Sequence, residues 1–153
     1  MALLVQKYGG TSVGSIERIQ AVADKIIRYK EQGNQMVVVV SAMSGETNRL
    51  TDLAKQIDPQ IRGRELDVLL TTGEQVTIAL LSMALEQKGH PAVSYTGAQV
   101  KILTDDAHNK ARILSIDAGN ISHDLNQGKV VVVAGFQGVD DKGNITTLGR
   151  GGS

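Results

Sequence analysis

The chain has 153 residues, of which 41% are hydrophobic and 21% are charged, a length and composition typical of about one globular domain. Its 16 basic and 16 acidic residues cancel and only 3% of its residues are aromatic, which argues against a nucleic-acid or anionic-membrane partner. The sequence contains no cysteine, and this excludes disulfides, thiolate metal sites and a cysteine nucleophile.

The first residues carry no basic region followed by a long apolar stretch, so we expect no secretory signal peptide. Purely aliphatic runs are far shorter than the roughly 20 residues that a membrane-spanning helix needs. We therefore expect a soluble, cytoplasmic protein.

Short apolar runs alternate with helical patterns, which predicts βα units around a largely parallel sheet. The first strand is predicted at residues 3–8, and Ser15 is placed to cap a helix that Gly33 closes. The run MVVVV at 36–40 is β-branched and does not alternate, which predicts a strand buried on both faces.

The middle of the chain predicts two helices and a strand. One helix follows the segment SAMSGETN (41–48), with Ser44 or Thr47 as its N-cap, and runs through Asp58. A longer helix is predicted from 64 to 88, and the run AVSYT (92–96) supplies the strand. The expected apolar face of the long helix includes Val68, Val76, Ala79, Leu80, Met83 and Ala84.

In the last third, two short extended pieces are predicted around DDAHNKAR (105–112), and Asp117 is placed to cap a short helix that ends at Gln127. The run KVVVVAGF (129–136) predicts another buried strand, and the turn DDKGN (140–144) predicts a β-hairpin. The fold class is therefore α/β, a layered αβα unit whose glycine-rich loops gather at the carboxyl ends of the strands. Open α/β sheets bind their ligands at that edge.

The segment KYGGTSVGS (7–15) has the ingredients of a phosphate-binding loop. It is not a Walker A loop, because Ser15 stands where that motif needs lysine, and it does not match the dinucleotide glycine pattern either. Adjacent Gly9 and Gly10 would let backbone amides approach an anion, and the following helix N-terminus adds partial positive charge. Lys7 supplies a compact point charge for a phosphate oxygen. The alternative is that the glycines only form a tight strand-to-helix turn.

Two further segments carry candidate binding groups. Ser41, Ser44, Thr47 and Asn48 could contact a small polar ligand, although helix capping explains any one of them equally well. Gly73 lies within a helical pattern, where a glycine usually has a packing or functional reason, and Glu74 beside it could receive an ammonium group.

The segment TTLGRGGS (146–153) places Arg150 in a glycine-rich stretch, where a guanidinium fork suits a carboxylate or a phosphate. A disordered tail is the alternative. The three histidines show no metal-binding spacing, so we expect surface residues and no metal site, and we expect Asp105 and Asp106 to form a solvated loop pair.

These segments together, in this order and along the whole chain, resemble the aspartate kinases of the amino-acid kinase superfamily. The motifs that carry the resemblance are KYGGTSVGS, VVVVSAMSGETN, TTGEQVT, VSYTG, HNKARI, GFQGVD and TTLGRGGS. The resemblance implies ATP-dependent phosphorylation of the side-chain carboxylate of L-aspartate, the entry step to lysine, threonine and methionine synthesis. It implies ATP as co-substrate, Mg²⁺ carried with ATP, and a homo-oligomeric parent protein.

The resemblance also implies roles for individual residues. The catalytic and phosphate-binding residues would be Lys7, Tyr8, Gly9, Gly10 and Ser41, with Lys7 stabilising the transferring phosphoryl group. Glu74 would take the amino group of aspartate and Arg150 a carboxylate. The full set of implied substrate-binding residues is Thr47, Glu74, Phe136, Arg150, Gly151 and Ser153. Aspartate would attack the γ-phosphate in line and would need no strong base, because its carboxylate is already ionised.

The chain departs from that family where it stops. Family members continue past GRGGS into the nucleotide-binding half of the kinase domain and then into regulatory ACT-type domains. We therefore expect residues 1–153 to be the amino-terminal, amino-acid-binding part of an aspartate kinase. Alone, it should be inactive as a kinase and prone to self-association through an exposed sheet edge. The alternatives are another amino-acid kinase, such as an acetylglutamate, glutamate or uridylate kinase, a non-catalytic module that binds an amino acid or an anion, and a purely structural fragment.

Overall fold

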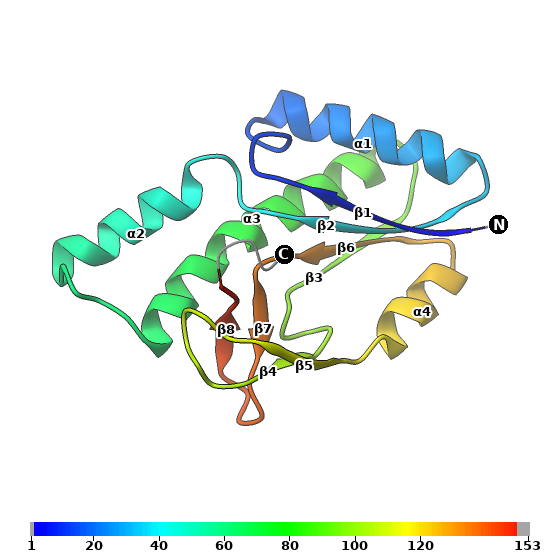
Figure 1. Ribbon diagram of the computed structural model, residues 1–153. Coiled ribbons are helices and arrows are strands. Elements are labelled where there is room, and N and C mark those ends of the chain that lie inside the picture. Colours follow the sequence, from blue (N-terminus) through cyan, green and yellow to red (C-terminus); the bar gives the residue numbers. More distant parts are fainter. Residues whose placement is uncertain (1, 150–153) are drawn as a thin grey trace.

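The computed structural model describes residues 2–149, in which strands and helices alternate along much of the chain (Figure 1). Its elements are β1 (Leu3–Tyr8), α1 (Ile16–Glu31), β2 (Gln35–Val40), α2 (Glu46–Ile57), α3 (Arg64–Gln87), β3 (Ala92–Tyr95), β4 (Ile102–Thr104), β5 (Ile113–Ile116), α4 (Gly119–Asn126), β6 (Val130–Ala134), β7 (Gln137–Val139) and β8 (Ile145–Thr147). Each helix and strand predicted from the sequence is present, and most bounds agree within one or two residues.

The first sheet is parallel throughout, with the strand order β1-β2-β6-β3. Tyr8 pairs with Val40, and Val40 pairs with Ala134, so the carboxyl ends of β1, β2 and β6 lie side by side. The loops that leave these three strands therefore begin at one edge of the sheet, as predicted. This edge carries the candidate site.

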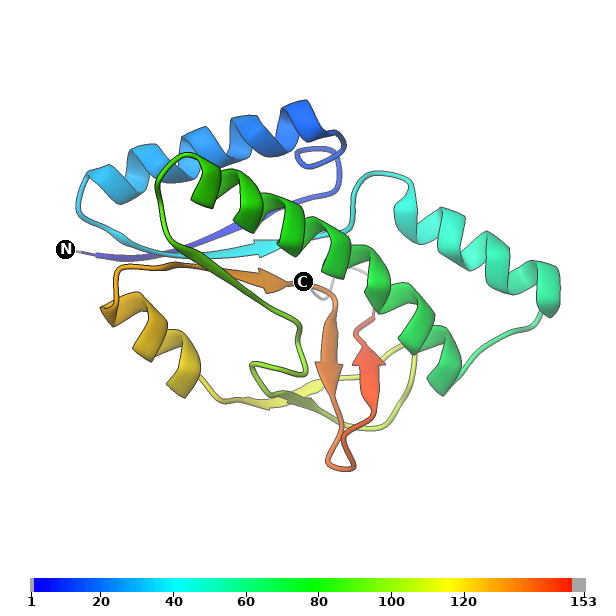
Figure 2. The same ribbon diagram turned by 180° about the vertical axis from the view of Figure 1, so that it is seen from behind.

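Helices cover both faces of this sheet and form the αβα layers that the sequence predicts. Helices α1 and α3 lie on one face and α4 lies on the other (Figures 1 and 2). Val38 and Val132 pack in the core on the α1 and α3 side, whereas Val37 and Val131 pack with Leu125 of α4. Consecutive valines thus serve opposite cores, which explains why these strands show no alternation of polar and apolar residues.

A second sheet, not expected from the sequence, has the strand order β5-β4-β7-β8. Strands β7 and β8 form the predicted antiparallel hairpin, in which Gln137 lies opposite Thr147. Strand β4 pairs with β5 and also, in parallel, with β7. The hairpin follows β6 directly, so the two sheets meet at residues 135–137.

The helix predicted at 64–88 is present as α3, but its predicted apolar face is only partly correct. Leu80 and Ala84 pack against the core as expected. The side chains of Val76 and Met83 are 48% and 62% exposed, whereas the carboxylates of Asp67 and Glu74 are buried. By length and composition alone α3 could cross a membrane, yet half of that stretch is buried inside the fold. It packs against α1, α2, β3, β6 and β8, so we interpret it as a core helix of this fold.

Two of the three predicted helix caps are wrong. Ser15 caps α1 as expected, and its Oγ accepts a hydrogen bond from the Arg18 N–H at 3.2 Å. The N-cap of α2 is Gly45, with a left-handed φ of 82°, rather than Ser44 or Thr47. The N-cap of α4 is Ala118, although the Asp117 carboxylate still accepts from the Gly119 N–H at 3.0 Å.

Candidate functional site

A pocket of about 410 Å³ opens at the carboxyl ends of β1 and β2. The residues around it come from β1, the two loops that follow β1 and β2, the start of α2, the middle of α3 and the β6–β7 connection. They are Lys7, Gly10, Ser41, Ala42, Met43, Ser44, Gly45, Thr47, Asn48, Glu74 and Phe136. Eight of the candidate residues from the sequence therefore line one pocket.

The loop after β1 is held against the loop after β2 by backbone contacts. The Gly10 carbonyl accepts from the Ser44 N–H at 3.1 Å, and a Cβ at Gly10 would lie 2.9 Å from the Ala42 carbonyl oxygen. Glycine at position 10 is thus required by the close approach of two backbones.

Gly9 has no such structural reason. Its φ is not positive, and no atom of the described chain lies within 4 Å of a Cβ built there. Within residues 2–149 the N–H groups of Gly9, Gly10 and Thr11 donate to no protein acceptor. Free amides beside open space suit an anion that approaches the backbone closely.

Lys7 brings a positive charge to the same pocket. It is exposed, and no carboxylate of residues 2–149 forms an ion pair with it. Tyr8, the next residue in β1, points to the opposite face of the sheet. Its side chain is buried in the core beside α1, and its hydroxyl donates to Gln6 Oε1 at 2.9 Å. The Tyr8 side chain is therefore not at the pocket where the resemblance implied a phosphate contact.

The N-terminus of α2 also faces the pocket, through Gly45, Thr47 and Asn48. Its N-cap is a glycine, so no side chain caps the first-turn N–H groups. Helix N-termini favour negative charge. Together with Lys7, this end of the pocket is suited to anions.

Glu74 provides the acidic group of the pocket and comes from α3. The residue is only 1% exposed, and Gln137 Nε2 donates to its Oε1 at 3.1 Å. Burial raises the pKa of Glu74 to about 7, although hydrogen bonds from Gln137 and from the Ala42 N–H oppose that rise. It is therefore not the solvated glutamate that the sequence left open, and a ligand cation beside it would favour its ionised form.

Close packing explains why a glycine occupies position 73 within a helix. A Cβ at this position would lie 2.9 Å from the Ala42 Cβ, so α3 touches the loop after β2 at a point where a side chain does not fit. This contact sets the depth at which Glu74 enters the pocket.

Phe136 lies where β6 passes into β7 and has a φ of 70°, a conformation that bulky residues rarely adopt. Its carbonyl accepts from the Leu148 N–H at 2.8 Å, which ties the end of β8 to the pocket rim. Strained backbone of this kind is typical of ligand sites.

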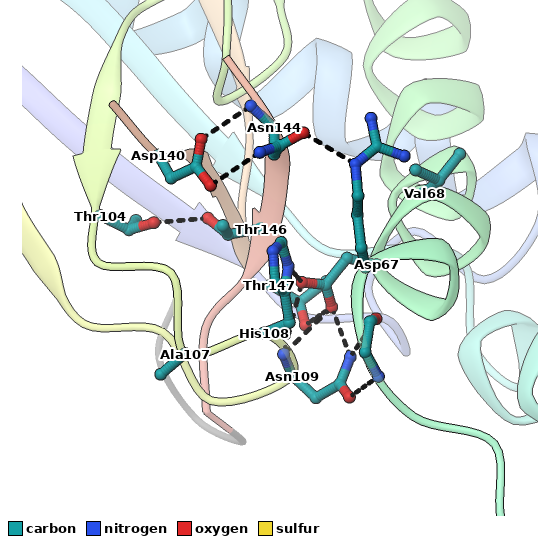
Figure 3. A network of polar contacts seen from close by, with 12 residues as sticks. Asp67, Val68, Thr104, Ala107, His108, Asn109, Asp140, Asn144, Thr146 and Thr147 are labelled. Atoms are coloured by element: carbon teal, nitrogen blue, oxygen red, sulfur yellow. Dashed lines mark hydrogen bonds and ion pairs between the residues drawn. The ribbon is translucent and has the colours of Figure 1, made fainter. Parts of the chain in front are cut away.

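A second polar cluster, centred on Asp67, lies beside the hairpin and was missed in the sequence (Figure 3). Asp67 is fully buried and accepts hydrogen bonds from His108 Nδ1 at 2.7 Å, Asn109 Nδ2 at 2.6 Å and Thr147 Oγ1 at 2.6 Å. His108 is therefore not the surface residue that we expected. No local signal marks this cluster, because its members lie about 40 residues apart in the chain.

The Asp67 cluster continues into the turn of the hairpin. Asp140 accepts from the Asn144 N–H at 2.8 Å, and Asn144 Oδ1 accepts from Arg64 Nε at 2.7 Å. Burial raises the pKa of Asp140, but the hydrogen bonds from Asn144 and from the Lys142 N–H outweigh it and hold the pKa below its usual value. This cluster fastens the hairpin to α3 and does not line the pocket.

Asp105 is likewise more than a solvated loop residue, because its Oδ1 accepts from the N–H groups of Ala107 and Arg112. Within residues 2–149 no group of three or more histidine, aspartate or glutamate side chains is arranged to hold a metal ion. The predictions for Arg150, Gly151 and Ser153 lie outside the described residues.

Within residues 2–149 the geometry thus brings a lysine without an ion-pair partner, backbone amides without a protein acceptor and a helix N-terminus to one pocket with a buried carboxylate. The model of the amino acid kinase family matches residues 2–153 of this sequence. The chain belongs to the amino acid kinase family. Its parallel sheet with helices on both faces agrees with the fold of solved aspartokinases.

Among curated proteins, the chain is 71% identical to an aspartate kinase of Stutzerimonas stutzeri and 58% identical to aspartokinase 2 of Bacillus subtilis. Both matches cover 100% of this chain but only 37% and 38% of the relatives. The chain therefore spans less than two fifths of the length of these relatives.

Two solved structures are similar over nearly the whole chain. The aspartate kinase of Synechocystis has a TM-score of 0.79 and 55% identity, and the match covers 97% of this chain and 24% of that one. Aspartokinase III of Escherichia coli, solved in complex with aspartate and ADP, has a TM-score of 0.81 and 23% identity over 99% of this chain and 44% of that one. At that lower identity the second likeness shows the fold alone.

Proposed function

We propose that residues 1–153 form the amino-acid-binding part of an aspartate kinase, which transfers the γ-phosphoryl group of ATP to the side-chain carboxylate of L-aspartate. The observation that carries the proposal is the buried, hydrogen-bonded Glu74 in the same pocket as the exposed Lys7. The names of relatives with 58–71% identity support it.

In this proposal Glu74 binds the ammonium group of aspartate. Thr47 and Phe136 line the same pocket and would contact the rest of the amino acid. Arg150, Gly151 and Ser153 complete the substrate-binding set by resemblance, with the guanidinium of Arg150 on a carboxylate. The acceptor carboxylate is already ionised at neutral pH, so the pocket has to orient it and not to deprotonate it.

The phosphoryl group would lie at the cationic end of the pocket. Lys7 and the N–H groups of Gly9 and Gly10 would stabilise charge on the transferring phosphoryl oxygens, and the Ser41 hydroxyl would contact the nucleotide phosphates. Because the Tyr8 side chain points into the core, a contact from this residue would have to come from its backbone. ATP would arrive as its Mg²⁺ complex, with the ion as part of the co-substrate.

The second candidate is a non-catalytic module that binds an amino acid or an anion. It is favoured for the isolated chain by the share of the relatives that the chain covers, 37% in the first comparison. We expect the 153 residues alone to bind aspartate without forming aspartyl phosphate. Formation of aspartyl phosphate by the purified chain would contradict that expectation.

Calorimetric titration of the purified chain with L-aspartate at pH 8 tests the proposal. We expect heat with L-aspartate and none with N-acetyl-L-aspartate, which lacks the ammonium group, and weaker binding of L-glutamate. Glu74→Gln should abolish the heat. Glu86→Gln, which changes an exposed carboxylate of the same helix, should leave it unchanged.

Equal binding of the acetylated ligand, or full binding by the Glu74→Gln variant, would reject the assigned role of Glu74. A preference for glutamate or acetylglutamate over aspartate would move the protein to another branch of the family. Titration with MgATP alone then reports whether the phosphate end of the pocket binds without further chain.

For the whole protein we further propose a cytoplasmic enzyme of lysine, threonine and methionine synthesis that works as a homo-oligomer. Its product, an acyl phosphate, is a reactive mixed anhydride that a subsequent reductive or acyl-transfer step must consume. Deletion of the gene should therefore produce a requirement for those amino acids.

A further inference from the structure

Gln137 lies where the two sheets meet and contacts the carboxylate that the pocket uses. It is the first residue of β7 and is only 3% exposed. Its Nε2 donates to Glu74 Oε1 at 3.1 Å and to the Thr71 carbonyl at 3.3 Å, and its Oε1 accepts from the Gly97 N–H at 3.2 Å. Gln137 itself does not line the pocket.

These contacts fix the orientation of the amide. Reversing it would place the amide oxygen against the Thr71 carbonyl and the Glu74 carboxylate, and the NH₂ group against the Gly97 N–H. Both repulsions are absent in the observed orientation, in which each polar atom of the amide has a complementary partner. Gln137 therefore presents a donor, not an acceptor, to Glu74.

The backbone around Gln137 is also closely fitted. A Cβ at Gly97 would lie 2.4 Å from the Gln137 carbonyl oxygen, and a Cβ at Gly138 would lie 2.5 Å from Thr104 Cγ2. Across the hairpin Gln137 faces Thr147, whose hydroxyl donates to Asp67. Two residues that face each other on the hairpin thus hold two buried carboxylates of α3, seven positions apart.

We propose that Gln137 is a positioning residue that holds the Glu74 carboxylate in the orientation in which it receives the ammonium group of the amino-acid ligand. The inference rests on the proposed function and deepens it. The sequence resemblance assigned no role to Gln137, although the motif GFQGVD contains it.

The hydrogen bond from Gln137 also affects the protonation state of Glu74. A hydrogen bond to a carboxylate favours its ionised form, so Gln137 opposes the effect of burial. The other ionisable groups near Glu74 are Lys7, across the pocket, and Glu46 of α2, which packs beside Gly73 and is paired with Arg49. Variants of Gln137 leave these groups in place.

The test measures the Glu74 carboxyl directly by ¹³C NMR titration of the 153-residue chain without ligand. Gln137→Met removes the donor and keeps the length of the side chain. Gln137→Leu also removes the donor, with a shorter apolar side chain, and serves if the methionine variant does not fold. In both variants we expect the pKa of Glu74 to rise by about one unit or more.

L-Aspartate affinity provides the second measurement. Loss of the hydrogen bond from Gln137 should weaken binding about tenfold at pH 6.5, where the variant's Glu74 is almost fully protonated. The loss should be smaller at pH 8.5, where a much larger share of Glu74 is ionised. A purely structural defect would weaken binding equally at both pH values. That equal loss, or an unchanged pKa of Glu74, would overturn the proposal.

Thr147→Val is the matched control, because it removes the neighbouring hydroxyl that holds Asp67 and leaves the amide on Glu74. It should lower stability without moving the pKa of Glu74, and an equal shift in this variant would also count against Gln137. The NMR titration needs no ligand. The chain could therefore fail to bind aspartate while Gln137→Met still shifts the pKa of Glu74. That result would reject the proposed function, but the effect of the Gln137 hydrogen bond on Glu74 would stand.

Discussion

The charge of Glu74 makes the stability of this protein depend on pH in an unusual direction. Burial raises the pKa of Glu74 to about 7 in the folded protein, from an ordinary value of 4.5. Between these values the folded state binds more protons than the unfolded state, so the free energy of unfolding falls as pH rises. The contribution of Glu74 is complete below pH 4.5 and is lost as the pH passes 7.

We predict that Glu74→Gln is less sensitive to pH than the wild type. The shift corresponds to about 3 kcal/mol, so unfolding in urea at pH 5 and pH 8 should separate the two proteins by up to that amount. Glu86→Gln should follow the wild type. An identical pH dependence of the wild type and Glu74→Gln would mean that the carboxylate remains ionised in the folded protein.

The neighbouring glycines of the first loop should respond differently to the same substitution. Gly10→Ala places a Cβ 2.9 Å from the Ala42 carbonyl oxygen, which should cost about 1–3 kcal/mol of stability. Gly9→Ala meets open space and should change stability by less than about 0.5 kcal/mol. Thermal unfolding of the two variants measures this difference, and equal losses would contradict the distinction.

The longest helix shows how much an element's sequence pattern can predict. The pattern gave the extent of α3 correctly, because propensity and a closing glycine are local signals. It gave the buried face only in part. Leu80 and Ala84 pack against the core, but Val76 and Met83 remain exposed, and partners from distant segments bury Asp67 and Glu74. Predicting the buried face of a helix from the spacing of its apolar residues assumes that carboxylates face solvent. That assumption fails where the helix contributes carboxylates to a buried polar site.

The same limit applies to the site. Lys7, Gly10 and Glu74 could be predicted because of their places in the pattern. Lys7 lies at the end of a strand, Gly10 lies in the loop after that strand, and Glu74 lies beside a glycine that interrupts a helical pattern. Gln137 could not, because its role arises where the hairpin meets α3, 63 residues away along the chain. The second sheet was missed for a related reason, as β4 and β7 pair across a long separation and are only three residues each.

Asp67 should control how firmly the hairpin and the β4–β5 loop are held against α3. Asp67→Asn replaces one acceptor oxygen with an NH₂ group that faces donors from His108, Asn109 and Thr147, and we expect a loss of at least about 3 kcal/mol. Hydrogen exchange should rise in residues 105–112 and 145–148 before it rises in β2 or β6. Exchange that rises evenly over the chain would show that the cluster is not a local fastening.

At the scale of the whole molecule, the parallel sheet ends at β1, which pairs only with β2 within residues 2–149. Leu3 and Val5 of this strand are 54% and 66% exposed. An edge strand with free backbone groups and apolar side chains is a ready template for another strand. We propose that the chain self-associates through β1.

Val5→Lys tests this proposal, because a charged side chain on an edge strand disfavours strand pairing at little cost to the fold. We expect sedimentation velocity to show concentration-dependent association of the wild type and a shift toward monomer for Val5→Lys. Leu114→Lys, at the exposed edge of the second sheet on β5, is the matched control and should leave the association unchanged. Association abolished by Leu114→Lys alone would move the interface to β5, and a wild type that stays monomeric at every concentration would reject self-association through either edge.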